Sequence, residues 1–257
     1  MVHVRELKAM TDILVVDQVS KSFGNMMAVN NVSFTVSEGA IYGIAGPNGA
    51  GKTTLFNAIS SIPYRPDNGR ILFRGKPVEN LSAHDIVRLG IARTFQRETF
   101  FESLTVLENV VIGGVYGHRS QRGVTRRQAL DALTLVGLEA KAAESPRPLP
   151  LFEKKRLMLA TALVMEPLLL LLDEPVAGLT QGEIDEMLTL IETIHQQGVT
   201  IILIEHVLPL LLALSPRIMI LNHGQRLVEG TPADIISDPQ VIEAYLGKRG
   251  QHELTSS

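Results

Sequence analysis

The sequence contains no cysteine among its 257 residues, which excludes disulfide bonds and thiol chemistry but leaves the compartment open. It also has no basic surplus, because 24 Lys and Arg stand against 27 Asp and Glu and give a formal net charge of −3. Proteins that bind nucleic acid usually present a positive surface. The composition therefore disfavours a general nucleic-acid-binding protein.

The sequence also has no uninterrupted apolar run of the ~20 residues that a membrane-spanning helix requires. The most apolar stretch, 199–221, is broken by Glu205, His206, Pro209, Pro216 and Arg217. We interpret it as a buried strand, a helix and a second buried strand. Residues 1–11 carry charges and no apolar core, so we expect no secretory signal peptide there. Any membrane contact is then expected through partner proteins.

What the sequence does have is enough apolar material, 45% of the residues, for one large α/β domain or a core with an inserted lobe. Short apolar and β-branched runs predict strands at 13–19, 32–36, 40–45, 71–73, 168–172 and 200–204. The last two are apolar throughout, as parallel strands buried on both faces are. Residues 217–221 and 226–229, joined by Asn222-His223-Gly224, are typical of a β-hairpin.

Helical patterns occupy 51–60 and 181–197, and Gly198 is expected to end the second. Between Gln96 and Met165 the signals are mainly helical, with candidates at 126–136 and 153–163 and a proline-containing loop at 141–150 between them. We therefore predict an α/β core formed by 1–95 and 166–257, with a helical lobe inserted at 96–165.

The strongest motif is a glycine-rich loop that matches G-x-x-x-x-G-K-[ST] in full. It follows a predicted strand and opens a predicted helix, so backbone N–H groups and the helix N-terminus can surround phosphate groups. The lysine would reach the β- and γ-phosphates of a nucleotide, and the hydroxyl after it would bind Mg²⁺. The motif consists of Gly46, Pro47, Asn48, Gly49, Ala50, Gly51, Lys52 and Thr53.

A second motif is the acidic pair Asp173 and Glu174, which follows the apolar run Leu168–Leu172. Open α/β sheets bind ligands at the carboxyl ends of their strands. Asp173 would hold Mg²⁺ there, and Glu174 would polarise the water that attacks the terminal phosphate. An acidic pair after a strand can also simply begin a helix, but the complete phosphate-binding loop favours the catalytic interpretation.

With these two motifs in this order, the chain resembles the ATP-binding subunits of ABC transporters along nearly its whole length. Residues 175–179 (Pro-Val-Ala-Gly-Leu) and the spacing to His206 match that family. Residues 90–96, 104–110 and 241–247 resemble the branch that serves importers of leucine, isoleucine and valine, which also includes cassettes for urea, amides and other hydrophobic amino acids. The resemblance implies an α/β P-loop NTPase core with an antiparallel β lobe and an inserted helical subdomain.

The resemblance also implies roles for further residues. Gln96 matches the glutamine that touches Mg²⁺ and couples the nucleotide state to the helical lobe, and His206 matches the histidine that contacts the γ-phosphate. Phe23 matches the aromatic residue that stacks on adenine, and Thr54 extends the nucleotide-binding loop beyond Thr53. Gln96 and His206 would thus join Glu174 in catalysis.

The chain departs from the family at two places. The family signature Leu-Ser-Gly-Gly-Gln should precede the helix that holds Arg156, but residues 149–153 read Leu-Pro-Leu-Phe-Glu. The serine hydroxyl and the close backbone approach that glycine permits are absent there. Thr180 also replaces the usual Asp or Asn. Both segments reach across the family's head-to-tail dimer to the partner's ATP, which favours a heterodimer with one competent site.

The function that the resemblance implies is ATP binding and hydrolysis, with ATP and Mg²⁺ as cofactors, at the cytoplasmic face of the membrane. It would drive uptake of branched-chain or related amino acids through two permease subunits, served by a solute-binding protein and a second ATPase subunit. Two alternatives are a regulatory nucleotide-binding subunit with little hydrolysis of its own and the ATPase of a urea or amide importer. An ABC protein acting on ribosomes or DNA would usually carry two cassettes or a long coiled-coil insertion, so no nucleic-acid partner is expected.

Overall fold

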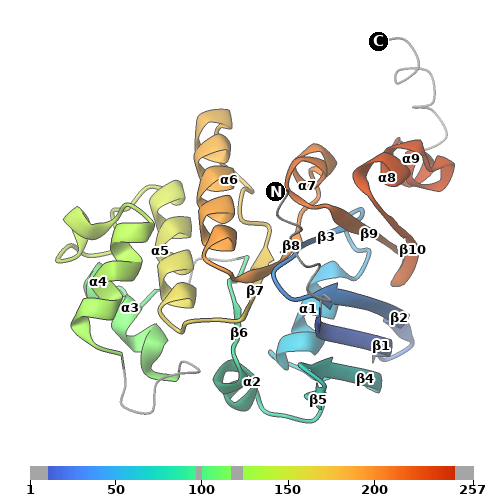
Figure 1. Ribbon diagram of the computed structural model, residues 1–257, viewed down its shortest axis with the longest axis horizontal. Coiled ribbons are helices and arrows are strands. Elements are labelled where there is room, and N and C mark those ends of the chain that lie inside the picture. Colours follow the sequence, from blue (N-terminus) through green and yellow to red (C-terminus); the bar gives the residue numbers. More distant parts are fainter. Residues whose placement is uncertain (1–10, 97–99, 117–123, 247–257) are drawn as a thin grey trace, which may run out of the picture.

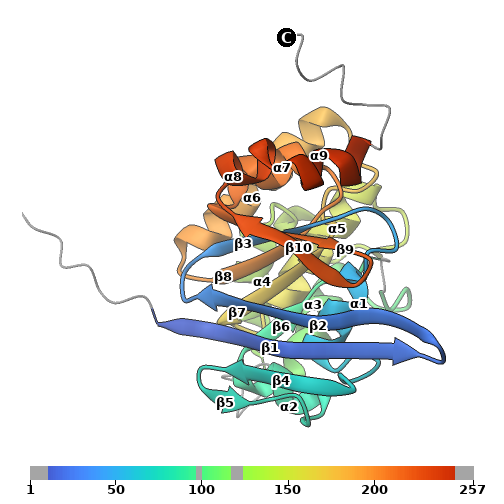
Figure 2. The same ribbon diagram turned by 90° about the vertical axis from the view of Figure 1, so that its right-hand side faces the viewer.

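Two β-sheets organise the computed structural model, which describes residues 11–96, 100–116 and 124–246 (Figure 1). The smaller sheet is antiparallel, with the strand order β2-β1-β4-β5. Its strands are β1 (Asp12–Phe23), β2 (Met26–Ser37), β4 (Asn68–Phe73) and β5 (Lys76–Pro77). Figure 2 shows the long β1–β2 hairpin lying across the molecule beside the larger sheet.

The larger sheet has the strand order β10-β9-β3-β8-β7-β6. Strands β6, β7, β8, β3 and β9 run parallel, and β10 pairs with β9 as an antiparallel edge strand. Their bounds are β3 (Ile41–Ala45), β6 (Ile91–Arg93), β7 (Leu169–Asp173), β8 (Thr200–Ile204), β9 (Arg217–Asn222) and β10 (Gln225–Gly230). The parallel arrangement brings the carboxyl ends of β3, β6, β7 and β8 to one edge of the sheet, where ligands of open α/β sheets bind.

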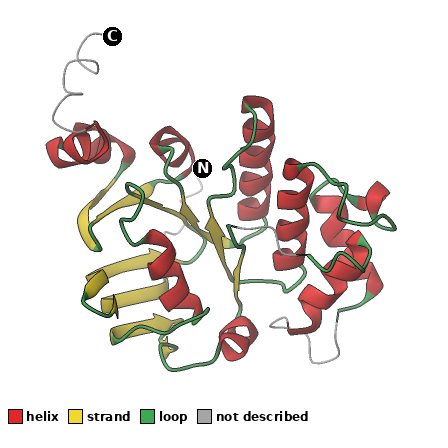
Figure 3. Cartoon of the chain, turned by 180° about the vertical axis from the view of Figure 1, so that it is seen from behind, coloured by secondary structure: helices red, strands yellow, loops and turns green. Residues whose placement is uncertain are grey.

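Three helices form a separate lobe at one end of the molecule, as Figures 1 and 3 show. They are α3 (Val106–Gly113), α4 (Arg126–Leu135) and α5 (Leu151–Leu163), and each packs against the other two. They lie between β6 and β7 in the sequence, although these two strands are neighbours in the sheet. The lobe is therefore an insertion between adjacent strands, and its exact limits at 96–165 stay a prediction.

The remaining helices surround the larger sheet. Helix α1 (Lys52–Ser60) follows β3, and α2 (Ala83–Leu89) precedes β6; the others are α6 (Gln181–Gln196), α7 (Leu208–Leu214), α8 (Pro232–Ser237) and α9 (Pro239–Leu246). Short 3-10 turns occupy Gly114–Tyr116 and Glu139–Lys141. Among the described helices, none combines the length and apolar character needed to cross a membrane.

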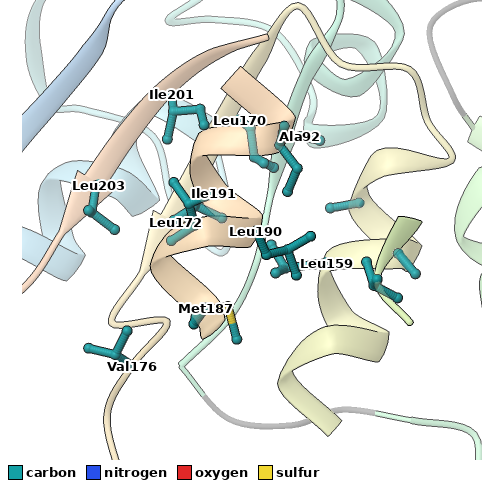
Figure 4. Close-up of a cluster of buried hydrophobic side chains, with 14 of the residues drawn as sticks. Ala92, Leu159, Leu170, Leu172, Val176, Met187, Leu190, Ile191, Ile201 and Leu203 are labelled. Carbon is teal, nitrogen blue, oxygen red and sulfur yellow. The ribbon is translucent and has the colours of Figure 1, made fainter. Parts of the chain in front are cut away.

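Each central strand is buried on both faces, which explains its uninterrupted apolar sequence. Alternate residues of β7 and β8 face opposite sides: Leu170 and Ile201 join the cluster with α5 and α6, while Leu171 and Ile202 join the cluster with α1 and the small sheet. Figure 4 shows the first cluster, in which Leu190 and Ile191 of α6 meet the strand side chains. Two apolar layers thus hold the strand ends that carry the functional residues.

Most of the expected elements are confirmed. The stretch 199–221 is strand, helix and strand, and 217–230 is a hairpin. Strands β1 and β2 are longer than the apolar runs 13–19 and 32–36, because antiparallel pairing continues through polar residues such as Lys21 and Ser22. Helices α2, α8 and α9 were not anticipated, since each has only six to eight residues, too few for a clear helical period.

Candidate nucleotide site

The glycine-rich loop connects β3 to α1 at the carboxyl edge of the larger sheet. Gly46 has φ 153°, and a Cβ there would lie 2.1 Å from the carbonyl oxygen of Leu221. Gly51 has φ 100°, and a Cβ there would lie 2.2 Å from the carbonyl oxygen of Ala28. Only glycine fits either position, because the close neighbours are backbone atoms that cannot move aside as a side chain can. The loop is therefore clamped between β9 and β2.

Lys52 is the first residue of α1, and its side chain turns back into the loop. Its Nζ donates hydrogen bonds to the carbonyl oxygens of Gly46 at 2.6 Å and Pro47 at 3.0 Å. Burial lowers the pKa of Lys52, while the nearby carboxylates of Glu174 and Asp173 oppose the shift. A cation held in this way is available to phosphate oxygens that enter the loop, and these can replace the two carbonyls as stronger, charge-assisted partners.

Asp173, the last residue of β7, is buried, and its two carboxylate oxygens have different surroundings. Its Oδ2 accepts a hydrogen bond of 2.8 Å from Nη2 of Arg93, whereas Oδ1 is buried with no hydrogen-bond partner. Burial raises the pKa of Asp173, and the Arg93 guanidinium acts against that increase. Arg93 was not among the residues identified from the sequence, because its contact with Asp173 joins the ends of two strands that are 80 residues apart.

Glu174 adopts a left-handed backbone conformation with φ 49°, which a residue other than glycine occupies only at a cost. The Glu174 side chain lies next to the two other expected catalytic residues. Oε2 accepts a 2.9 Å hydrogen bond from Nε2 of Gln96, and Oε1 lies 3.9 Å from Nδ1 of His206. The structure thus brings together three residues that are distant in the sequence, since Gln96 lies 78 residues before Glu174 and His206 lies 32 residues after it.

A second carboxylate, that of Glu205, lies behind this group and is 1% exposed. Its Oε1 accepts a hydrogen bond of 3.2 Å from the backbone N–H of Val176, and its Oε2 lies 3.9 Å from Nδ1 of His206. Burial raises the pKa of Glu205 to about 7. Lys155 of α5, itself buried, donates a 3.1 Å hydrogen bond to the carbonyl oxygen of Glu174 and so links the helical lobe to this strand end.

A cleft of about 530 Å³ opens beside these residues. It is lined by residues 48–54 of the loop, by Gln96 and Glu174, and by two hairpin tips: Met26, Met27, Ala28, His223 and Gly224. The tip of β9–β10 is fixed there, because Gly224 donates its N–H to the Ala50 carbonyl at 2.9 Å and accepts from Asn30 at 2.7 Å. The sequence predicted this hairpin but gave no signal that its tip borders the loop.

Phe23 lies at the end of β1, directly across the hairpin from Met26. It is 39% exposed, and its ring meets the edge of Tyr64 with centroids 4.9 Å apart. It is not part of the cleft lining, whereas its hairpin neighbours Met26 and Met27 are. Its role in binding a base stays a prediction, and Tyr64 is a second aromatic residue packed against it.

The residues present fit a magnesium ion that is shared with phosphates. Among the described residues, no group of three or more His, Cys, Asp or Glu side chains could hold a metal alone. Mg²⁺ usually binds through one or two protein oxygens together with phosphate and water. The unpartnered Oδ1 of Asp173 and the exposed Thr53 at the cleft supply such oxygens, and Gln96 lies in the same lining. Mg²⁺ bound there would neutralise charge on the phosphates.

The segment 149–153 has become part of the helical lobe. Pro150 occupies the N-cap position of α5 without a capping side chain, and Leu151 begins the helix. Phe152 is 8% exposed in the core of the lobe, with the guanidinium of Arg156 over its ring at 4.0 Å. A Cβ on Gly178 would meet Leu151 at 2.9 Å, so this segment packs on the loop that precedes Thr180.

Thr180 retains one property of the residue that it replaces. Its hydroxyl and its backbone N–H both donate to Oε2 of Glu183 at 2.8 Å, which caps the first turn of α6. The substitution therefore keeps the start of α6 while changing the side chain at that point.

Comparisons with known proteins agree with this geometry. A family described as "ABC transporter" matches residues 29–177, and one described as "Branched-chain amino acid ATP-binding cassette transporter" matches residues 225–250. The chain is 38% identical to the high-affinity branched-chain amino acid transport ATP-binding protein LivG of Salmonella typhimurium, over 92% of this chain and 98% of that protein. It is 35% identical to the corresponding protein BraF of Pseudomonas aeruginosa, with the same coverage.

Solved structures give the same result for the fold. A nucleotide-free ATP-binding cassette from an ABC transporter superimposes with a TM-score of 0.85 and 28% identity, covering 92% of this chain and all of the other. An ATP-binding cassette of an ABC transporter in its ADP conformation gives a TM-score of 0.83 and 29% identity, covering 92% and 99%. The fold class expected from the sequence is thereby confirmed.

Proposed function

The chain belongs to the ABC transporter ATP-binding family, and from this premise we propose that it energises the import of branched-chain amino acids. As a member it binds nucleotide and is the ATPase of a transporter. The amino-acid specificity is inferred from the names of its relatives and from the match of its C-terminal segment. A urea or amide importer remains the alternative substrate class.

The observation that carries the proposal for the site is the convergence of Lys52, Gln96 and Glu174 on one cleft. Residues 46–54 surround the phosphates, with Lys52 on the β- and γ-phosphates. Thr53, Gln96 and Asp173 would hold Mg²⁺. Glu174 accepts a proton from the attacking water, and His206 binds the γ-phosphate beside it. Gln96 donates to Glu174 in this structure, so movement of the Gln96 segment changes the position of the catalytic carboxylate.

We place the chain at the cytoplasmic face of the membrane, bound to two permease subunits. The loop 100–105 supplies a docking surface, because Asn109 accepts from the Phe101 N–H at 2.9 Å and donates to the Phe101 carbonyl at 3.1 Å. This holds Phe101 58% exposed while Phe100 packs against the lobe. We also expect Arg97 and Glu98 to belong to this surface, but both lie outside the described residues.

The ATPase partner is proposed to be a different subunit. Residues that act on the chain's own nucleotide are all present. In the segment that would face the partner's nucleotide, however, Pro150 takes the place of the serine, and Leu151 and Phe152 take the places of the two glycines. The competent site then combines this chain's phosphate-binding loop with the partner's signature. The opposite site, closed by residues 149–153, binds ATP and hydrolyses it slowly.

The Lys52→Ala variant tests the nucleotide site in the purified chain. Loss of a charge-assisted hydrogen bond costs about 1.5–3 kcal/mol, or about 10- to 150-fold in the Kd for Mg-ATP. Lys76→Ala serves as the control, because Lys76 is an exposed residue on the short strand β5. An unchanged Kd in Lys52→Ala, measured by titration, would contradict the assignment.

A further inference from the structure

Arg93 is the last residue of β6 and is not one of the proposed nucleotide or Mg²⁺ ligands. It nevertheless lies between the three segments that carry the proposed Mg²⁺ ligands. Its side chain is 4% exposed and forms a 2.8 Å ion pair with Asp173, which is fully buried. Buried charges are costly unless they are paired and hydrogen-bonded. An arginine that is retained in such a place therefore has its orientation strongly fixed by its partners.

The other terminal nitrogen of the guanidinium, Nη1, binds helix α1. Nη1 of Arg93 donates to Oδ1 of Asn57 at 2.7 Å and to Oγ of Ser60 at 3.2 Å. Asn57 is four residues after Thr53, so it lies one helical turn further along the same face of α1. Asn57 is held in turn by Tyr64, to whose hydroxyl it donates at 2.7 Å.

The guanidinium also lies over two aromatic rings. Its carbon lies 5.6 Å from the ring centroid of Phe56 on α1 and 5.4 Å from that of Phe95. Phe95 is the residue before Gln96. One side chain thus contacts the helix that carries Thr53, the strand end that carries Asp173, and the segment that carries Gln96.

We propose that Arg93 is a positioning residue that fixes Asp173 Oδ1 toward Mg²⁺ and sets the spacing of the three segments that bind it. This rests on the proposed function, because Thr53, Gln96 and Asp173 are its metal ligands. Arg93 holds Oδ2 and so leaves Oδ1, which has no protein partner, as the oxygen available to the metal shell.

The role requires an arginine rather than any cation. Nη1 and Nη2 are separate donors in a rigid plane, and here one serves α1 while the other serves Asp173. A lysine ammonium is a point charge on a flexible stem, so it would retain the ion pair without fixing the distance to α1.

The test separates metal binding from nucleotide binding. The Kd of a non-hydrolysable fluorescent ATP analogue is measured for the full chain in EDTA and in saturating Mg²⁺, and the ratio gives the gain due to the metal. Loss of an outer partner of a metal ligand typically costs about 10–100-fold in metal affinity. In Arg93→Met the gain due to the metal should therefore fall about tenfold or disappear, while the Kd measured in EDTA stays unchanged. Arg93→Lys should fall between this variant and the wild type.

Two further variants complete the design. Asn57→Ala removes the shorter of the two hydrogen bonds from Arg93 to α1 and keeps the buried ion pair. It should therefore reduce the gain in a chain that folds even if Arg93→Met does not. Arg156→Met is the matched control: Arg156 is also largely buried and ion-paired, with Glu186, but it lies in the helical lobe. The gain due to the metal in Arg156→Met should equal that of the wild type.

A wild-type gain in both Arg93→Met and Asn57→Ala would overturn the proposal. Equal losses in EDTA and in Mg²⁺ would also overturn it, because they would show a general structural effect. A wild-type chain that binds no nucleotide at all would instead refute the proposed function, and the two failures are therefore distinguishable.

Discussion

Replacing Phe152 with alanine measures how far residues 149–153 have become a packing element. Phe152 is 8% exposed within the core of the helical lobe, and Arg156 covers its ring at 4.0 Å. Truncating a buried phenylalanine costs about 3–5 kcal/mol through lost burial and the cavity left behind. Loss of the cation–π contact adds about 0.5–1 kcal/mol. Together these give an expected loss of about 3.5–6 kcal/mol in the free energy of unfolding of the variant.

The measurement is chemical unfolding in urea, with Leu151→Ala as the control at the neighbouring position. Leu151 is 37% exposed, so its truncation should cost clearly less, about 1–2 kcal/mol. The Kd of the chain for Mg-ATP should stay unchanged in both variants, because residues 149–153 do not line its own cleft. A loss below about 1 kcal/mol in Phe152→Ala would refute the packing role.

Two other predictions concern the buried acid and the docking loop. The pKa of Glu205 is raised from its ordinary value of 4.5 to about 7, so the folded chain binds more protons than the unfolded chain between these values. The stability that Glu205 contributes is therefore full below about pH 4.5 and is lost as the pH rises through about 7. Glu205→Gln should be less sensitive to pH across this window in urea unfolding; an identical pH dependence would exclude Glu205 as the cause. Because the chain has no cysteine, a single cysteine at Glu102 would be unique, and it should cross-link to a permease subunit in the assembled transporter. Cross-linking to other proteins but to no permease would count against the docking surface.

The sequence predicted those parts of the site that local patterns encode. Lys52 and Thr53 belong to one continuous motif, and Asp173 follows an apolar run of strand length, so their positions could be predicted from local patterns. Gln96 and His206 were placed by family resemblance, and the structure brings both to Glu174.

The residues that were missed are those whose role depends on contacts between distant segments. Arg93 is one polar residue at the end of a three-residue strand, and only the sheet order places it beside Asp173, 80 residues later. His223 belongs to an ordinary hairpin turn. Only the hydrogen bonds of its neighbour Gly224 with Ala50 and Asn30 bring this turn to the cleft. Periodicity and turn chemistry contain no information about such pairings.

The proposed heterodimer assigns ATP hydrolysis in the assembled transporter to this chain's own site. The most direct measurement is ATP turnover by complexes of equal stoichiometry that carry Glu174→Gln in this chain or the equivalent change in the partner ATPase. Loss of a general base costs about 10²–10⁴-fold, so the change in this chain should remove most turnover, while the partner's change leaves much of it. The chain purified alone should hydrolyse ATP slowly. Full turnover with Glu174→Gln, together with its loss through the partner's change, would contradict the account.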